Sequence, residues 1–353
     1  MTFVLGRDGS VEAGPTARLG HYRARDGSRG AALHLDVDSP HAGLVVGKRG
    51  YGKSYTLGVL AEALARTRGV APVVVDPMGV FGTLAEEGNG ESVPARVVSD
   101  PTIPATLDPR SWCDLLALSP ESGAGSLVWQ AAAETDTLAA MQAHVADADA
   151  GASVRRAAAN HLSLAESWDV FAADGLTAQS LASPDATVVD VSGLDEAPAT
   201  AVVRALAESL YRARVDQRVD RLPWLLVDEA HTFFDSVAGT ALRTLLTRGR
   251  APGVSLVAAT QRPSAVPDVA RSQVDVLVAH RLTSRADLDA LERVQPTYLD
   301  TALDAQLPTD PGDVVVLDDA TETVHAARVR ERHTPHGGGS PRASAVGIDS
   351  THL

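Results

Sequence analysis

The sequence predicts an α/β fold: a mostly parallel sheet with helices on both faces, plus a helical insertion. Three observations support this prediction. Short, continuously apolar segments alternate with amphipathic segments along most of the chain. The apolar segments lack a strict alternation of apolar and polar residues, which is typical of strands buried on both faces. Residues 104–183 contain almost no strand-like segment, so we expect the helical insertion there.

The predicted strands are short apolar segments bounded by polar residues or glycine. They lie at residues 44–47, 71–76, 186–191, 223–228, 253–260, 274–280, 312–317 and 322–329. Residues 1–40 are polar and glycine-rich apart from the segment AALHLDV, which predicts a small N-terminal β segment. We therefore expect the main domain over residues 41–333.

Predicted helices separate these strands. Leucine and valine recur at helical spacing in residues 54–68, 197–217 and 238–250. The insertion at about 104–183 is expected to hold helices over residues 127–148 and 153–170. Residues 334–353 are rich in glycine, serine and proline and show no periodicity, so they predict a disordered tail.

Composition excludes several protein classes. The single cysteine, Cys113, excludes an intramolecular disulfide framework and a cysteine-based zinc site. No apolar run approaches the ~18 residues that a membrane-spanning helix needs, and the N-terminus lacks a secretory signal pattern. We therefore expect a cytoplasmic protein without a membrane association.

The charge balance is unusual. There are 45 acidic and 31 basic residues, for a net charge of −14, and the only lysines are Lys48 and Lys53. An acidic, lysine-poor surface keeps a protein hydrated and soluble in concentrated salt, which predicts a halophilic source. The alternative is a GC-rich genome that has replaced lysine with arginine.

Both lysines lie in one glycine-rich loop. Residues 47–54, GKRGYGKS, match G-x-x-x-x-G-K-[ST] between an apolar strand and an amphipathic helix, the context that this motif requires. Backbone N–H groups of such a loop surround phosphates, and the helix N-terminus adds partial positive charge. Lys53 would reach the β- and γ-phosphates of ATP, and the Ser54 hydroxyl would bind Mg²⁺. The predicted nucleotide-binding residues are Gly47, Lys48, Arg49, Gly50, Tyr51, Gly52, Lys53, Ser54 and Tyr55.

Two adjacent carboxylates end a later apolar strand, in LPWLLVDEAH at residues 222–231. Asp228 would hold Mg²⁺ through water, and Glu229 would activate the attacking water as a general base. His231 in the same segment is more often structural than catalytic, so we leave it out of the site. The pair suits ATP hydrolysis better than a kinase reaction, which remains the weaker alternative.

Three further segments narrow the class. The strand at 253–260 ends in Thr260-Gln261-Arg262-Pro263, and earlier strands end in Asp76-Pro77-x-Gly79 and Asp190-x-Ser192-Gly193. With the glycine-rich loop and VDEAH in this order, the chain resembles the HerA/FtsK superfamily of P-loop ATPases, with the HerA-like branch closest. RLTSRADL at 281–288 is also similar to a segment of that family.

The resemblance covers about residues 40–330 and implies a RecA-like P-loop ATPase. Members form rings, usually hexamers, that translocate DNA with energy from ATP. By motif position, it assigns phosphate and Mg²⁺ binding to Lys53 and Ser54, metal coordination to Asp228, water activation to Glu229, and γ-phosphate sensing to Gln261. Only about 43 residues precede the loop strand, too few for the N-terminal β-barrel of HerA, and neither the membrane segments nor the winged helix of FtsK-type proteins is apparent. We therefore expect a core-only member.

The family also requires an arginine supplied by the adjacent subunit. Arg248 and Arg250 are our candidates because they end a predicted helix just before the sensor strand, and Arg281 and Arg285 come second. Residues 243–285 contain seven arginines and two acidic residues. The acidic net charge disfavours DNA binding, and this local excess of positive charge softens that objection. Some of these arginines would line a central pore.

We therefore expect an Mg²⁺-dependent ATPase that acts as a DNA translocase or helicase in a homo-oligomeric ring. A nuclease or another protein is a candidate partner. One alternative is a nucleotide-controlled switch or scaffold in a defence or mobile-element system. Another is a DNA-packaging motor, which shares the same catalytic residues. Stimulation of ATP hydrolysis by DNA separates the first hypothesis from the switch.

Overall fold

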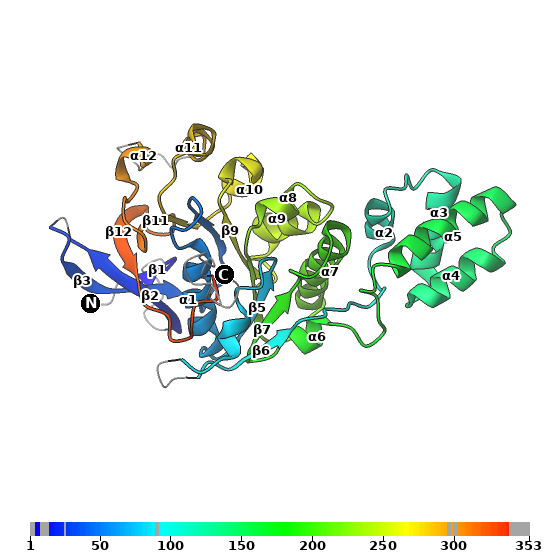
Figure 1. Cartoon of the computed structure of the whole chain (residues 1–353), viewed down its shortest axis with the longest axis horizontal. Coiled ribbons are helices and arrows are strands. Elements are labelled where there is room, and N and C mark those ends of the chain that lie inside the picture. Colours follow the sequence, from blue (N-terminus) through cyan, green and yellow to red (C-terminus); the bar gives the residue numbers. More distant parts are fainter. Residues whose placement is uncertain are drawn as a thin grey trace, which may run out of the picture.

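The computed structural model describes residues 4–7, 14–24, 26–88, 92–294, 298 and 302–338. Its strands form one mixed sheet (Figure 1). The parallel part comprises, in sheet order, β10 (Val276–Ala279), β4 (Ala42–Val46), β9 (Ser255–Thr260), β8 (Leu222–Val227), β5 (Val70–Asp76), β7 (Ala186–Asp190) and β6 (Ala95–Val98). Beyond β10 the sheet continues with antiparallel pairing through β11 (Asp313–Asp318), β12 (Thr323–Val329), β2 (Thr16–Arg23) and β3 (Arg29–Asp36), and β1 (Val4–Leu5) pairs in parallel with β3. The predicted mostly parallel α/β sheet is confirmed.

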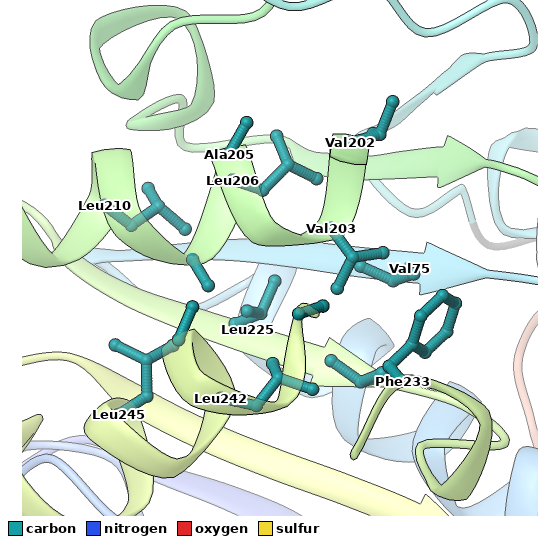
Figure 2. Packing of buried hydrophobic residues seen from close by; sticks show 14 of the residues in the cluster. Val75, Val202, Val203, Ala205, Leu206, Leu210, Leu225, Phe233, Leu242 and Leu245 are labelled. Atoms are coloured by element: carbon teal, nitrogen blue, oxygen red, sulfur yellow. The ribbon is translucent and has the colours of Figure 1, made fainter. Parts of the chain in front are cut away.

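Helices cover both faces of the parallel strands. Successive residues of a strand point to opposite faces. In β5, Val73 and Val75 join the core formed with α7 (Glu196–Val215) and α9 (Gly239–Arg248), whose side chains Figure 2 shows packed against the sheet. Val74 between them joins the core formed with α1 (Lys53–Ala65) on the other face. Burial on both faces explains why these strands are continuously apolar.

The predicted insertion is a group of helices at one end of the molecule (Figure 1). It contains α2 (Pro109–Leu115), α3 (Gly123–Glu134), α4 (Leu138–Asp147) and α5 (Ala152–Glu166). Its two ends meet where the Ile103 N–H donates to Val170 O (2.8 Å) and the Ala172 N–H donates to Ile103 O (3.0 Å). The buried Arg204 of α7 pairs with Asp114 of α2 at 3.0 Å and thereby joins the insertion to the core.

Two sequence predictions need correction here. The single helix predicted over residues 127–148 is two helices, because the chain turns at Thr135 and the Thr137 side chain caps the next helix by accepting the Ala140 N–H. The disorder predicted from residue 334 is wrong for the start of that segment, because Thr334 is buried and hydrogen-bonded to Glu62. Residues 339–353 of that prediction lie outside the described residues.

The β segment predicted in residues 1–40 continues the main sheet, because β2 pairs with β12. Short helical turns complete the described fold: η1 (Gly82–Ala85), α6 (Ala178–Leu181), α8 (His231–Phe234), η2 (Pro263–Ala265), α10 (Asp268–Arg271), α11 (Arg285–Glu292) and α12 (Leu303–Gln306). Among the described residues, no helix has the length and apolar character needed to cross a membrane.

Candidate functional site

The glycine-rich loop connects β4 to α1. Gly50 has a φ of 81° and Gly52 a φ of 108°, both in the left-handed region that favours glycine. Gly52 immediately precedes α1, so the loop wraps around the positive end of a helix whose first N–H groups lack helical partners. This geometry provides a binding site for a phosphate chain.

His280 lies beneath this loop and was not singled out by the sequence. It directly follows β10, and its Nε2 lies 2.9 Å from the Thr56 Oγ1 in α1. A Cβ on Gly47 would lie 2.6 Å from the His280 Cβ, and one on Gly52 would lie 3.1 Å from its Cε1. The two glycines therefore leave room for the ring. Burial, with Lys53 nearby, lowers the pKa of His280 to about 4, so the ring is neutral at physiological pH.

The order of the strands brings the loop and the carboxylates together. Strand β9 lies between β4 and β8, and all three are parallel, so their carboxyl ends meet at one edge of the sheet. There Ser54 Oγ donates a 2.7 Å hydrogen bond to Asp228 Oδ2. Asp228 is fully buried, and this burial raises the pKa of its carboxyl. A carboxylate buried in this way gains from a neighbouring cation.

Glu229 has an unusual backbone conformation. Its φ of 43° lies in the left-handed region, which a non-glycine residue rarely adopts. The Ala230 N–H donates to Ala259 O at 2.8 Å and fixes the chain beyond it. Glu229 Oε2 lies 3.3 Å from His231 Nδ1. His231, which the sequence analysis left out of the site, therefore contacts the candidate base. Strain of this kind clusters at functional sites.

One cleft of about 580 Å³ gathers much of the predicted site. Among the predicted nucleotide-binding and catalytic residues, it is lined by Arg49, Gly50, Gly52, Lys53, Ser54, Tyr55 and Glu229. Burial lowers the pKa of Lys53 despite the nearby carboxylates of Glu229 and Asp228. A buried ammonium group with polar partners at hand is well placed to receive an anion.

Other predicted residues lie outside the cleft lining. Gly47 lies against His280, and the Lys48 Nζ lies 4.5 Å above the ring centroid of Tyr51, a cation–π contact. Gln261 directly follows β9 at the same sheet edge and is half-buried. Its sensing role stays a prediction.

The two first-choice arginines, Arg248 and Arg250, lie away from the loop of their own chain. Arg250 Nη1 lies 3.6 Å from Asp275 Oδ2, and Asp275 accepts the Ala42 N–H at the start of β4. Arg250 is therefore at the sheet edge opposite the glycine-rich loop, and Arg248 ends α9 nearby. Both side chains are exposed, as a contribution to a neighbouring subunit requires. Of the second-choice pair, Arg281 contacts the loop through its backbone carbonyl, which accepts the Lys48 N–H (2.8 Å), and Arg285 pairs with Asp289.

The residues present fit a magnesium ion that is also bound by phosphates. No group of three histidine, cysteine or carboxylate side chains among the described residues could hold a metal alone. Mg²⁺ in nucleotide sites typically uses one or two protein oxygens together with waters and substrate phosphates. The hydroxyl of Ser54 and the carboxylate of Asp228, already 2.7 Å apart, supply such oxygens.

Comparisons with known proteins agree with this geometry. A family model described as the central domain of the helicase HerA matches residues 17–124, which include the glycine-rich loop with its flanking strand and helix. This confirms the resemblance to HerA-type P-loop ATPases. A search of curated proteins finds no significant match for the chain.

Solved structures similar to this chain confirm the RecA-like P-loop fold. VirB4 of Thermoanaerobacter pseudethanolicus has a TM-score of 0.67 at 16% identity, over 91% of this chain and 98% of that one. The bacterial conjugative coupling protein TrwBΔN70 has a TM-score of 0.59 at 15% identity, over 95% and 99%. The plasmid coupling protein TrwB in complex with ADP and Mg²⁺ has a TM-score of 0.58 at 16% identity, over 84% and 87%. At these identities the similarity concerns the fold.

Proposed function

We propose that this HerA-like chain is an Mg²⁺-dependent ATPase that moves along DNA as a translocase or helicase. The observation that carries the proposal is the 2.7 Å contact between Ser54 and Asp228, beside a cleft lined by Lys53 and Glu229. Lys53 would bind the β- and γ-phosphates, Ser54 and Asp228 would hold Mg²⁺, and Glu229 would orient and deprotonate the attacking water. Gln261 would sense the γ-phosphate.

Magnesium, when bound, would neutralise charge on the phosphates. The buried carboxyl of Asp228 already accepts a hydrogen bond from Ser54, and a bound cation would stabilise its charged form. The TrwB structure solved with ADP and Mg²⁺ has a similar fold, which supports nucleotide and magnesium binding here.

We also propose that the active form is a homo-oligomeric ring, in which Arg248 or Arg250 of one subunit completes the site of the next. Their exposure, away from their own cleft, supports a role in trans. A closed ring would hold DNA topologically, which reduces the need for long-range attraction between an acidic protein and DNA.

Steady-state ATP hydrolysis with and without duplex DNA tests the motor. Because the composition predicts a halophilic source, the assay is run at high and at moderate salt. We expect a severalfold stimulation by DNA in the wild type and none in Lys53→Ala. The control is Arg66→Ala, an exposed residue directly after α1. Hydrolysis that is indifferent to DNA at both salt concentrations would contradict a DNA motor.

The second candidate is a nucleotide-controlled switch or scaffold. One observation favours it: residues 104–183, which include the protruding helices, contain ten acidic and three basic residues. Such a surface repels DNA and suits a protein partner. Binding of ATP that changes the oligomeric state without DNA-stimulated hydrolysis would select this function. Nucleotide binding would depend on Lys53 under this function as well.

A further inference from the structure

The cleft that contains Lys53 and Ser54 has a second group of lining residues, next to those expected to bind phosphate. These are Tyr55, Met78, Val80 and His336. Tyr55 directly follows Ser54, and its ring centroid lies 5.3 Å from that of His336. A Cβ on Gly337 would lie 2.7 Å from Val80 O, so the segment carrying His336 packs against the loop after β5. Apolar and aromatic groups therefore adjoin the phosphate-binding residues.

The two rings suit a planar ligand. Tyr55 and His336 meet edge to face, at an interplanar angle of 72°. This arrangement occupies one ring face and leaves others available for stacking. Burial, with Arg332 nearby, lowers the pKa of His336, so its ring is neutral and stacks without the cost of burying a charge.

Met78 is held in an unusual position for a large apolar side chain. It is 58% exposed, although its loop is well fixed. The buried carboxylate of Asp76 accepts the N–H groups of Met78 (3.2 Å) and Phe81 (2.7 Å). The Asp76-Pro77-x-Gly79 motif therefore presents Met78 at the rim of the cleft on a rigid loop. A flexible thioether side chain adapts well to the surface of a flat ligand.

His336 reaches the cleft on the C-terminal strap, which we define as residues 330–338. Glu62 of α1, fully buried, anchors this strap by accepting from the Thr334 N–H (3.0 Å), the His333 N–H (3.0 Å) and Arg330 Nη1 (2.7 Å). The Arg332 N–H donates to the Tyr55 hydroxyl at 2.7 Å. The strap is thus fastened to the helix that begins with Lys53.

We infer that Tyr55, Met78 and His336 form the subsite for the planar heterocyclic base of the nucleoside triphosphate. The C-terminal strap completes this subsite, and its anchoring on α1 couples base binding to the phosphate loop. The inference rests on the proposed function for the presence of a nucleotide, and it adds which residues recognise the base.

Isothermal titration calorimetry with two ligands tests the subsite. Mg²⁺–ATP carries a base, whereas Mg²⁺–tripolyphosphate offers the phosphates alone. Base–aromatic stacking predicts that His336→Ala weakens ATP binding by about tenfold, and we expect a smaller loss for Met78→Ala. Both variants should bind tripolyphosphate as the wild type does. Leu164→Ala, an exposed apolar truncation in the insertion, should change neither affinity.

The outcomes separate this inference from the proposed function. Unchanged ATP affinity in both His336→Ala and Met78→Ala would overturn the base subsite. Equal losses for ATP and tripolyphosphate would also overturn it, because the residues would then act on the phosphates or on the fold. A wild type that binds neither ligand, or Lys53→Ala that binds both normally, would instead overturn the nucleotide-binding function itself.

Discussion

Ser54 and Asp228, 174 positions apart in the chain, lie in direct contact through a 2.7 Å hydrogen bond between a hydroxyl and a carboxylate. The contact joins the first turn of α1 to the end of β8. Because β9 separates β8 from β4, the pairing depends on sheet order and not on sequence proximity. It turns two separate motifs into one candidate magnesium and phosphate site.

Asp228→Asn should stabilise the apo protein and inactivate it. The fully buried carboxyl has a pKa raised by burial, so its ionisation at neutral pH costs stability that a neutral amide avoids. We expect the melting temperature to rise by about 2 °C and ATP turnover to fall by about 100-fold or more. Thermal unfolding and hydrolysis assays measure these effects. Asp220→Asn, at an exposed carboxylate, is the control, and a lower melting temperature in Asp228→Asn would count against this account.

His280 should position the phosphate loop. His280→Ala removes the ring beside Gly47 and Gly52 and its contact with Thr56, so we expect KM for ATP to rise by about tenfold. His280→Gln retains a hydrogen-bonding group for Thr56 and should recover part of the loss. Steady-state kinetics measure both. An unchanged KM in the alanine variant would show that the loop holds its shape without this ring.

His280 should also make the fold sensitive to acid. Its pKa of about 4 in the folded protein, lowered by burial and by Lys53, lies below the ordinary 6.5. Unfolding therefore takes up a proton as the pH falls below 6.5, and the stability that depends on the neutral ring declines toward pH 4. Urea unfolding at pH 4.5 and 7 should show a larger acid-induced loss in the wild type than in His280→Gln. Equal losses would contradict this assignment.

His41 should have the opposite pH dependence. Burial opposes its protonation, but Asp275 at 3.0 Å and Asp36 at 3.6 Å outweigh burial and raise the pKa of His41 to about 9. Two further charges lie at this cluster: Arg250, 3.6 Å from Asp275, and Arg7, which is ion-paired with Asp36. The stabilisation is complete below pH 6.5 and is lost as the pH rises through 9. Urea unfolding should show a decline of up to about 3 kcal/mol over this range, which His41→Gln should abolish. The same decline in the variant would assign it to other groups.

Mixing two inactive variants tests the arginine supplied in trans. Lys53→Ala lacks the phosphate contact, and Arg248→Ala lacks the proposed contribution to the neighbour. In mixed rings, an intact Lys53 can face an intact Arg248, which should restore about a quarter of wild-type turnover. A parallel mixture with Arg250→Ala decides between the two arginines. Absence of recovery in both mixtures, with rings present by light scattering, would contradict a trans role for either residue.

Much of the fold and of the phosphate site was predictable because the signals are local. Residues 47–54 and the Asp228-Glu229 pair combine a motif with an apolar strand on their N-terminal side. Strand β6 went unrecognised because its four residues are only partly buried, so they do not form a continuous apolar run. The strand β2 was missed because its arginine and histidine residues interrupt the apolar pattern.

Other features depend on partners that are distant in the sequence. Glu62 anchors Arg330 across 268 positions, and nothing near either residue in the sequence indicates the pair. The position of His280 after a strand does not indicate its role, because its contact with Gly47 arises only in the fold. Helix spacing suggested Arg248 and Arg250, but it could not show that they lie at the sheet edge opposite the loop.

A comparison of ATP binding with ATP hydrolysis in Glu229→Gln is the sharpest test that this cleft hydrolyses ATP. Glutamine preserves the size of the side chain but cannot accept the proton of the attacking water. We predict that Glu229→Gln binds Mg²⁺–ATP with wild-type affinity by calorimetry while its turnover falls by at least about 100-fold. Wild-type turnover in Glu229→Gln would contradict the assignment of this cleft as the hydrolytic site.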